Sequence, residues 1–288
     1  MNKIGIRNIE VEIPSKWSEI DKRNLLYLAT KFPFQKTYGF ALYFFFHVLN
    51  LPKKPLLAFA IARNFILSKK LNLAWKNDQA MEYGEENIFE TQILIALHQL
   101  DNFEWLHTDM QFEKCLIDKF SVNLKKFYGP REYLSNVTSD EFRHAEFFFI
   151  NYYKTSDIYF LDRLIATLWR RKNSANSMED IRVPFSEFDI EQNVKKIKKL
   201  PDKLKFACLL CYTGMRNFLV NTDAAKAAFD GAESGSGNVL NNWGITLLRI
   251  AENSTFGSMQ EIKKTFISEI ILYISDMKLR NERLTQKN

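Results

Sequence analysis

Cysteine and histidine are scarce in this chain of 288 residues, which holds three cysteines and four histidines. Three cysteines (Cys115, Cys208 and Cys211) do not make the disulfide framework of a small secreted domain, so the sequence predicts a reduced cytoplasmic protein. Four histidines leave few partners for a nucleophilic serine or cysteine, and no such pair is evident from the sequence.

Long apolar runs are also missing. The most apolar stretches are 40–51, which contains His47, and 56–67, which contains Arg63. Both are shorter than the roughly 20 residues that a membrane-spanning helix needs. We interpret them as a buried helical hairpin joined by 51–55, and we predict no membrane segment. The first residues show no apolar core followed by small residues, so no secretory signal is expected.

The excess of positive charge is mild. The formal net charge is +6 and the pI is about 9.0, in a chain that is 46% hydrophobic and 26% charged. These fractions are typical of a globular protein, and the length allows one large domain or two modest ones. Phe, Lys, Ile and Asn are all common, as in AT-rich coding sequences, so composition explains the charge more simply than nucleic-acid binding does.

Helical spacing dominates after a short extended start. Residues 9–13 alternate apolar and charged side chains and end at Pro14, which predicts a strand. Helix starts are predicted by three capping pairs: Thr138 with Glu141, Asp189 with Gln192, and Ser258 with Glu261. The expected fold class is therefore mainly α, an irregular multi-helix bundle with a short N-terminal β element.

A break at Tyr128-Gly-Pro130 divides the expected bundle. It indicates an N-terminal helical region with the short β element over 1–128 and a C-terminal helical region over 129–288, unless the two form one continuous domain. The short apolar bursts within 101–128 fit strands and helical turns equally well. The clearest helix begins at Ser258 and has one apolar stripe, made of Met259, Ile262, Phe266, Ile270 and Ile274.

Two Glu-x-x-His pairs, Glu104 with His107 and Glu141 with His144, have the spacing of a di-iron helix bundle. Such a bundle places another helix between the two pairs. The interval between His107 and Glu141 is too short for a helix of about twenty residues with its loops, and Gly129-Pro130 interrupts it. Glu141 has a simpler role as the partner of Thr138 in a helix cap. We therefore expect no bound metal.

Two other motifs are not expected to form an active site or a ligand-binding site. Cys208-Leu-Leu-Cys211 lies inside an apolar helix rather than at a helix start, and no second cysteine pair accompanies it. Both cysteines are expected to be buried packing residues. Residues 231–237 lack the Gly-Lys-Ser/Thr ending of a phosphate-binding loop, and we interpret them as a linker. No cofactor and no enzymatic activity are predicted.

Two basic clusters are the candidate partner-binding residues. One is Arg170, Arg171 and Lys172, which together with Arg163 flank a predicted helix end. The other is Lys195, Lys198 and Lys199, with Lys196, Lys203 and Lys205 nearby around Pro201. The simplest interpretation is a solvated helix face. The alternative is a patch that contacts an acidic protein or nucleic acid. Aromatic residues are not interleaved with these cations as they are in single-strand readers.

Short motifs spread over most of the chain form a familiar succession. They are Ile13-Pro-Ser-Lys-Trp17; Tyr128-Gly-Pro130 with Leu134-Ser-Asn136; Thr138 with Glu141-Phe142 and Ala145-Glu146; Asp162-Arg-Leu-Ile-Ala166; Arg182-Val-Pro-Phe185; and Trp243 with Phe256-Gly257. In this succession the chain resembles a group of phage and prophage proteins of Bacteroidota that lie among virion and tail-assembly functions. The resemblance implies a structural or assembly role, such as chaperoning or joining a tail component. It brings no catalytic residue.

The sequence therefore predicts a non-enzymatic phage-type structural or tail-assembly protein that acts through protein–protein contacts. Its expected partners are other phage structural or assembly proteins, with oligomer formation left open. Its expected location is the cytoplasm of the bacterial host, or the virion. The alternative is a nucleic-acid-associated accessory protein that uses the basic helical face. Only the alternative demands a binding affinity that falls steeply with salt.

Overall fold

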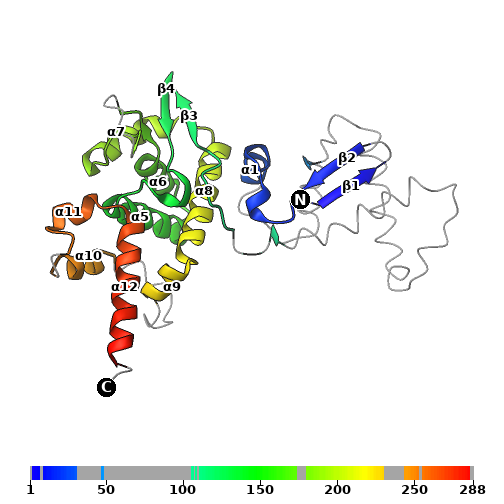
Figure 1. The fold of residues 1–288 in the computed structure, drawn as a ribbon. Coiled ribbons are helices and arrows are strands. Elements are labelled where there is room, and N and C mark those ends of the chain that lie inside the picture. Colours follow the sequence, from blue (N-terminus) through cyan, green and yellow to red (C-terminus); the bar gives the residue numbers. More distant parts are fainter. Residues whose placement is uncertain are drawn as a thin grey trace, which may run out of the picture. The chain divides into compact units, whose positions relative to one another are not determined.

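The computed structural model is mainly α-helical, which confirms the expected fold class (Figure 1). It describes residues 2–6, 9–30, 47–48, 105–106, 108, 110–173, 180–229, 243–252 and 255–285. The chain divides into two compact units, unit 1 (Met1–Met110) and unit 2 (Gln111–Asn288). Within the described part of the chain, every helix is too short or too polar to span a bilayer.

Some of the expectations lie outside the described residues. These are the helical hairpin over 40–67 apart from His47 and Val48, the linker over 231–237, and the first Glu-x-x-His pair, Glu104 and His107.

Unit 1 begins with a β-hairpin. Its strands β1 (Asn2–Ile6) and β2 (Ile9–Ile13) pair antiparallel, which confirms the strand expected over 9–13. A short 3-10 turn, η1 (Trp17–Glu19), and the helix α1 (Lys22–Ala29) follow. The helix begins after Asp21, whose carboxylate accepts a hydrogen bond from a backbone amide in the first turn, as a capping residue does.

Two tryptophans hold the segment after the hairpin. The rings of Trp17 and Trp105 meet edge to face, with centroids 5.0 Å apart. Trp105 Nε1 donates a hydrogen bond to the Pro14 carbonyl at 3.1 Å, so both buried indoles contribute to packing that links distant parts of unit 1.

Unit 2 contains a small antiparallel sheet in the order β3 (Lys119–Val122), β4 (Lys125–Tyr128) and β5 (Arg170–Arg171). A two-residue turn joins β3 and β4, with φ of 48° at Asn123 and 65° at Leu124. Positive φ at both turn residues matches the right-handed twist of a hairpin, although leucine is rare in this conformation. Within the region 101–128 that the sequence pattern left open, residues 119–128 therefore form strands.

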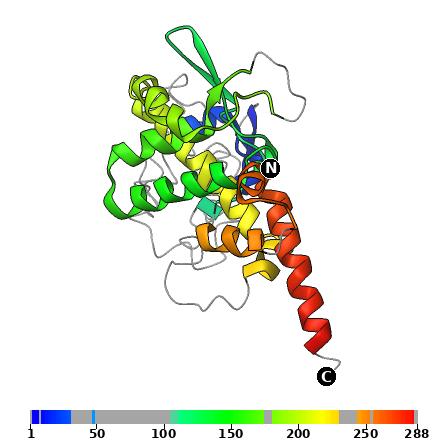
Figure 2. The same cartoon turned by 90° about the vertical axis from the view of Figure 1, so that its left-hand side faces the viewer.

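Four helices build the core of unit 2: α5 (Ser139–Thr155), α6 (Ile158–Leu168), α7 (Glu187–Ile197) and α8 (Asp202–Val220). The central one is α6, which packs against the other three, and every residue from Leu161 to Leu168 is buried. Figure 2 shows α5 and α6 running side by side. Because residues 161–168 of α6 are buried on every side, the polar side chains among them need hydrogen-bond or ionic partners inside the protein.

The C-terminal part adds α9 (Asp223–Phe229), α10 (Trp243–Glu252), α11 (Met259–Lys264) and α12 (Ile267–Thr285). α12 packs against α9 and α5, and α11 packs against α5 and α10. Both views of the ribbon show the second half of α12 projecting from the rest of unit 2 (Figures 1 and 2).

The single helix expected from Ser258 onward is wrong, because the chain breaks between α11 and α12. Thr265 is extended (φ −68°, ψ 141°), and Phe266 forms an antiparallel bridge with Thr138. The Ser139 amide also donates a hydrogen bond to the Thr265 carbonyl at 2.8 Å. Pairing with the segment before α5 therefore replaces helical hydrogen bonds at this point. Of the predicted stripe, Ile262 and Ile270 are fully buried, while Met259, Phe266 and Ile274 are partly exposed.

The capping predictions have mixed outcomes. Thr138 caps α5 by accepting from the Glu141 amide at 3.3 Å, and Glu261 accepts from the Ser258 amide at 2.6 Å at the start of α11. Both starts are confirmed. The start at Asp189 is wrong, because α7 begins two residues earlier and Asp189 lies in its first turn.

The division of the chain also differs from the expected one. The structure divides after Met110, whereas the sequence break suggested a division after Tyr128. The reason is the sheet: β4 pairs with β5, so residues 119–128 belong to unit 2.

Candidate functional site

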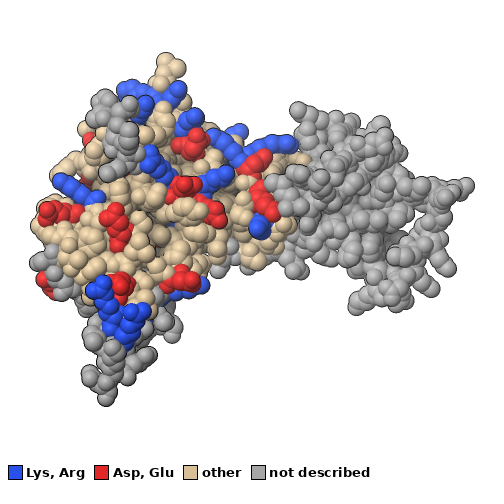
Figure 3. Space-filling model, viewed as in Figure 1, with Lys and Arg blue, Asp and Glu red and all other residues tan. Residues whose placement is uncertain are grey.

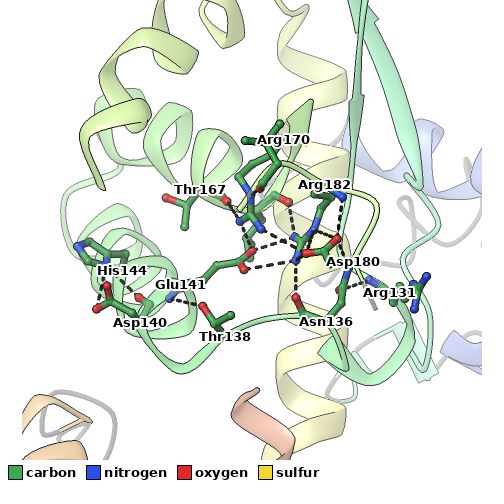
Figure 4. A network of polar contacts seen from close by, with 12 residues as sticks. Arg131, Asn136, Thr138, Asp140, Glu141, His144, Thr167, Arg170, Asp180 and Arg182 are labelled. Carbon is green, nitrogen blue, oxygen red and sulfur yellow. Dashed lines mark hydrogen bonds and ion pairs between the residues drawn. The ribbon is translucent and has the colours of Figure 1, made fainter. Parts of the chain in front are cut away.

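A buried network of charged residues lies where the start of α5, the end of α6 and the 180–185 segment meet (Figure 4). The Glu141 carboxylate is fully buried and faces two guanidinium groups. Its Oε1 lies 2.6 Å from Arg170 Nη1 and 2.8 Å from Arg182 Nη1. Arg182 also donates to the carbonyls of Leu168 at 2.7 Å and Asn136 at 2.6 Å. We call Glu141, Arg170, Arg182 and their partner Asp180 the arginine network.

Asp180 completes the charge balance of the arginine network. Its Oδ2 lies 2.9 Å from Arg182 Nη2 and 3.5 Å from Arg170 Nη2, and its Oδ1 accepts from the Asn136 amide group at 2.9 Å. Burial lowers the pKa of Arg170 despite the nearby Glu141. Burial acts in the same direction on Arg182, but the Glu141 and Asp180 carboxylates outweigh it and raise the pKa of Arg182. Two carboxylates therefore face two guanidinium groups.

This geometry corrects two sequence interpretations. Arg170 is only 4% exposed and serves the arginine network, so it is not part of a basic surface patch. Glu141 does not return to cap Thr138 with its side chain; the carboxylate turns toward the two arginines instead. Three of the motif residues quoted above, Asn136, Glu141 and Arg182, thus meet in one place.

The second Glu-x-x-His pair does not converge on a common site. The His144 ring points away from the Glu141 carboxylate (Figure 4). Its Nδ1 lies 2.9 Å from the Asp140 carbonyl, and its Nε2 lies 3.5 Å from Glu187 Oε1. Among the residues that the structure describes, no group of three or more His, Cys, Asp or Glu side chains is arranged to hold a metal ion.

Two further buried ionic contacts join the core helices. On α6, the Asp162 carboxylate lies 2.7 Å from the Lys205 ammonium on α8, and both side chains are buried. Lys205 is therefore an internal partner, although the sequence pattern grouped it with the basic cluster. On α5, Glu146 accepts from the Tyr212 hydroxyl at 2.5 Å and from Arg216 Nε at 2.8 Å, both of α8.

Tyr212 makes the stability of the fold depend on pH in the alkaline range. Burial raises the pKa of Tyr212 well above its ordinary value, and the Glu146 carboxylate adds to the effect. The folded state favours the neutral phenol. The contribution of Tyr212 to the free energy of unfolding is therefore complete below about pH 10 and is lost as the pH rises further. We expect the free energy of unfolding to fall less steeply above pH 10 in Tyr212→Phe than in the wild type, by up to about 1.4 kcal/mol per pH unit. Urea titrations at several pH values test this, and equal slopes would contradict it.

A cluster of cations involves the small sheet and α7. Lys125 lies two residues before Phe127 on β4, and Arg171 on β5 pairs directly with Phe127. The strand register therefore places both cations on the same face of the sheet as Phe127. Lys196 on α7 comes close to both. Burial lowers the pKa of Lys196, and the charges of Arg171 and Lys125 lower it further. We call Lys125, Arg171 and Lys196 the basic cluster.

The basic cluster differs from the predicted patch. Of the predicted residues, Arg171, Lys172, Lys195, Lys198 and Lys199 are exposed and Arg170 is buried. Lys125 was missed, because the sequence pattern did not show that residues 119–128 form a hairpin beside β5. Figure 3 shows Lys and Arg side chains gathered at the upper edge of the molecule, where Figure 1 places β3 and β4.

An aromatic surface lies where the middle of α5 meets the start of α6. It consists of Phe147, Ile158, Tyr159 and Phe160; the first three are 58%, 41% and 45% exposed. The rings of Phe147 and Phe160 are 6.5 Å apart between centroids, and those of Tyr159 and Phe160 are 5.1 Å apart. Phe147 is exposed because its neighbours Phe148 and Phe149 occupy the inner face of α5, and successive helical residues point about 100° apart.

A rigid cation borders the aromatic surface. The Arg163 guanidinium lies over the Tyr159 ring, 3.3 Å from its centroid, and its Nη2 lies 2.6 Å from Glu191 Oε1 on α7. Arg163 is itself buried, so these contacts hold the Tyr159 ring in one place. The Tyr159 ring of the aromatic surface would therefore lose little conformational entropy on contact with another molecule.

Comparison of the chain with models of known families, with curated proteins and with solved structures finds no match in any of the three.

Proposed function

We propose that the chain is a non-enzymatic structural or assembly protein of the phage type that acts through protein–protein contacts. The observation that supports this most strongly is the aromatic surface. Three large side chains, Phe147 in the middle of α5 and Ile158 and Tyr159 at the start of α6, are each more than two-fifths exposed. Water-exposed groups of this kind are disfavoured unless a partner covers them, and tyrosine and phenylalanine are enriched in protein interfaces.

The surroundings of the aromatic surface favour a protein partner. Tyrosine is among the residues that most often dominate binding energy, and the buried Arg163 stacks on the Tyr159 ring and holds it at the surface. The buried carboxylates Glu141, Glu146 and Asp162 each form an ion pair with a cation inside the fold, so they have a structural role. The resemblance to virion and tail-assembly proteins is consistent with this role. In this proposal the protein works in the cytoplasm of the bacterial host or in the virion.

Co-expression with the products of neighbouring genes tests the proposal. We expect one of them to co-purify with the wild-type protein and to be lost when Phe147 and Tyr159 are both changed to serine. Truncating two central interface residues should weaken binding by about 2 kcal/mol or more, at least roughly 30-fold. Phe188→Ser is the matched control, because Phe188 is 91% exposed on α7 and lies outside the aromatic surface. Equal binding by the double variant and the control would refute the proposal.

A nucleic-acid-associated role is the second candidate, and the basic cluster is the observation that favours it. Its three cations come from three different elements, and the charges of Arg171 and Lys125 add to burial in lowering the pKa of Lys196. Three phosphate contacts predict a slope of about −2.7 in a plot of log affinity against log salt, or a loss of about 40-fold between 50 and 200 mM. Changing Lys125 to alanine should make that slope shallower by about 0.9. The control is Lys203→Ala, an exposed lysine outside the basic cluster. A nucleic-acid affinity that does not change with salt concentration would exclude this role.

A further inference from the structure

The tip of the β3–β4 hairpin presents a large apolar side chain to water. Leu124 is 100% exposed, and its φ is 65°. A two-residue turn with positive φ at both positions favours Asn-Gly. Asn123 fits the first position, but a leucine at the second is strained where a glycine would not be. Neither packing nor turn geometry explains this leucine, so its side chain points to a contact outside the chain.

The charged side chains of the hairpin are all basic. Residues 119–128 include three lysines and no acidic residue. The strand register places Lys119 and Lys126 on one face of the sheet, and Lys125 with Arg171 of β5 on the other; all four are exposed. Asp118, at the base of the hairpin, lies 3.8 Å from Lys119, but both side chains are at least 60% exposed, so water screens this pair. These charges attract an anion that can meet the hairpin on both faces. Figure 3 shows uncharged atoms projecting above Lys and Arg side chains where Figure 1 places the hairpin.

The spread of these cations favours a groove over a flat anionic surface. Two lysines follow Leu124 directly, but Lys119 lies roughly 15 Å from the tip at about 3.3 Å per residue. Lipid headgroups around an inserted tip would attract Lys119 only weakly, because salt screens charges beyond about 8 Å. Phosphates on both walls of a nucleic-acid groove can meet the hairpin along its length. A single strand is disfavoured, since Phe120 and Phe127 are buried and offer no surface for base stacking.

We propose that the β3–β4 hairpin is an arm that binds double-stranded DNA by inserting Leu124 into the minor groove. The leucine enters a base step, partly unstacks it and bends the duplex, as the apolar wedges of minor-groove proteins do. Lys119, Lys125, Lys126 and Arg171 contact phosphates on either side. This inference rests on the nucleic-acid-associated role, the second candidate function, and names its partner and mode of binding.

Leu124→Gly separates the wedge from the phosphate contacts. Glycine adopts the φ of this turn without strain, so the variant should fold and melt at or above the temperature of the wild type. The probe is a DNA duplex of about 30 bp with a flexible TA step at its centre and fluorophores at both ends. The full-length wild type should bend it by about 20° or more, which energy transfer measures. Leu124→Gly should leave it straight and bind about tenfold more weakly, with an unchanged salt slope.

Two further variants serve as controls. Lys126→Ala should still bend the duplex at saturation, but its salt slope should be shallower by about 0.9. The double variant with Phe147 and Tyr159 changed to serine should bind and bend DNA like the wild type, because the aromatic surface serves the protein partner.

The outcomes separate this inference from the role on which it rests. Salt-dependent binding without bending, equal in the wild type and Leu124→Gly, would overturn the wedge and leave the nucleic-acid role standing. No binding to the duplex would overturn both. Binding to phosphatidylserine vesicles that is lost in Leu124→Gly, without DNA bending, would overturn the proposal and assign the hairpin to a lipid surface.

Discussion

Replacing Arg182 with leucine should destabilise unit 2 by about 3–5 kcal/mol, because the Glu141 and Asp180 carboxylates then lose their main counter-charge. Arg182 is 1% exposed and also holds two backbone carbonyls, which would be left without that donor. Urea unfolding followed by circular dichroism measures the change. Arg171→Leu is the control. Arg171 is exposed, so its replacement should change the free energy of unfolding by no more than about 0.5 kcal/mol.

The arginine network also predicts strong coupling between its members. Glu141→Gln in the wild type removes a charge that faces two guanidinium groups, whereas in Arg182→Leu it removes a charge that has already lost one of them and keeps only Arg170. The second change should therefore cost much less than the first, with a coupling energy of about 1–3 kcal/mol. Strict additivity would mean that the two side chains act independently despite their 2.8 Å separation.

Replacing Ile270 with aspartate should destabilise unit 2 by more than about 3 kcal/mol. Burial of an isoleucine contributes roughly 1.5–3 kcal/mol, and an unpaired carboxylate in its place adds a desolvation penalty. Ile270 is fully buried on α12. A domain of this size has a total stability of about 5–15 kcal/mol, so the variant should melt far below the wild type or fail to fold.

The control for this prediction lies on the same helix. Leu272 is 61% exposed, so Leu272→Asp should leave the melting temperature nearly unchanged. Equal effects at positions 270 and 272 would mean that α12 does not dock through the face that the structure assigns to it.

Local patterns predicted those parts of the fold that depend on neighbouring residues. The strand over 9–13 and the caps at Thr138 and Ser258 depend on residues within one turn of each other. The break after α11 was not predictable, because the apolar stripe continues through it. Only the Thr138–Phe266 bridge, between distant segments, stops the helix there.

Charged residues showed the same limit. Arg170 and Lys205 look like surface cations in the sequence, yet each has a buried carboxylate partner on another element. The lone acidic residue inside the apolar run of α6, Asp162, was a usable signal, since an isolated buried carboxylate requires a counter-charge. The aromatic surface had a weaker signal: the run Phe147-Phe148-Phe149 cannot place all its rings on one face of a helix.

Amide hydrogen exchange of the protein, free and bound to its co-purifying partner, tests the central claim most directly. Contact through the aromatic surface predicts that exchange slows on binding in the middle of α5, around Phe147, and in the first turn of α6, around Tyr159. The basic cluster, around Lys125 and Lys196, should exchange as in the free protein. Protection confined to β4, β5 and the end of α7, with no change around Phe147 and Tyr159, would contradict the account.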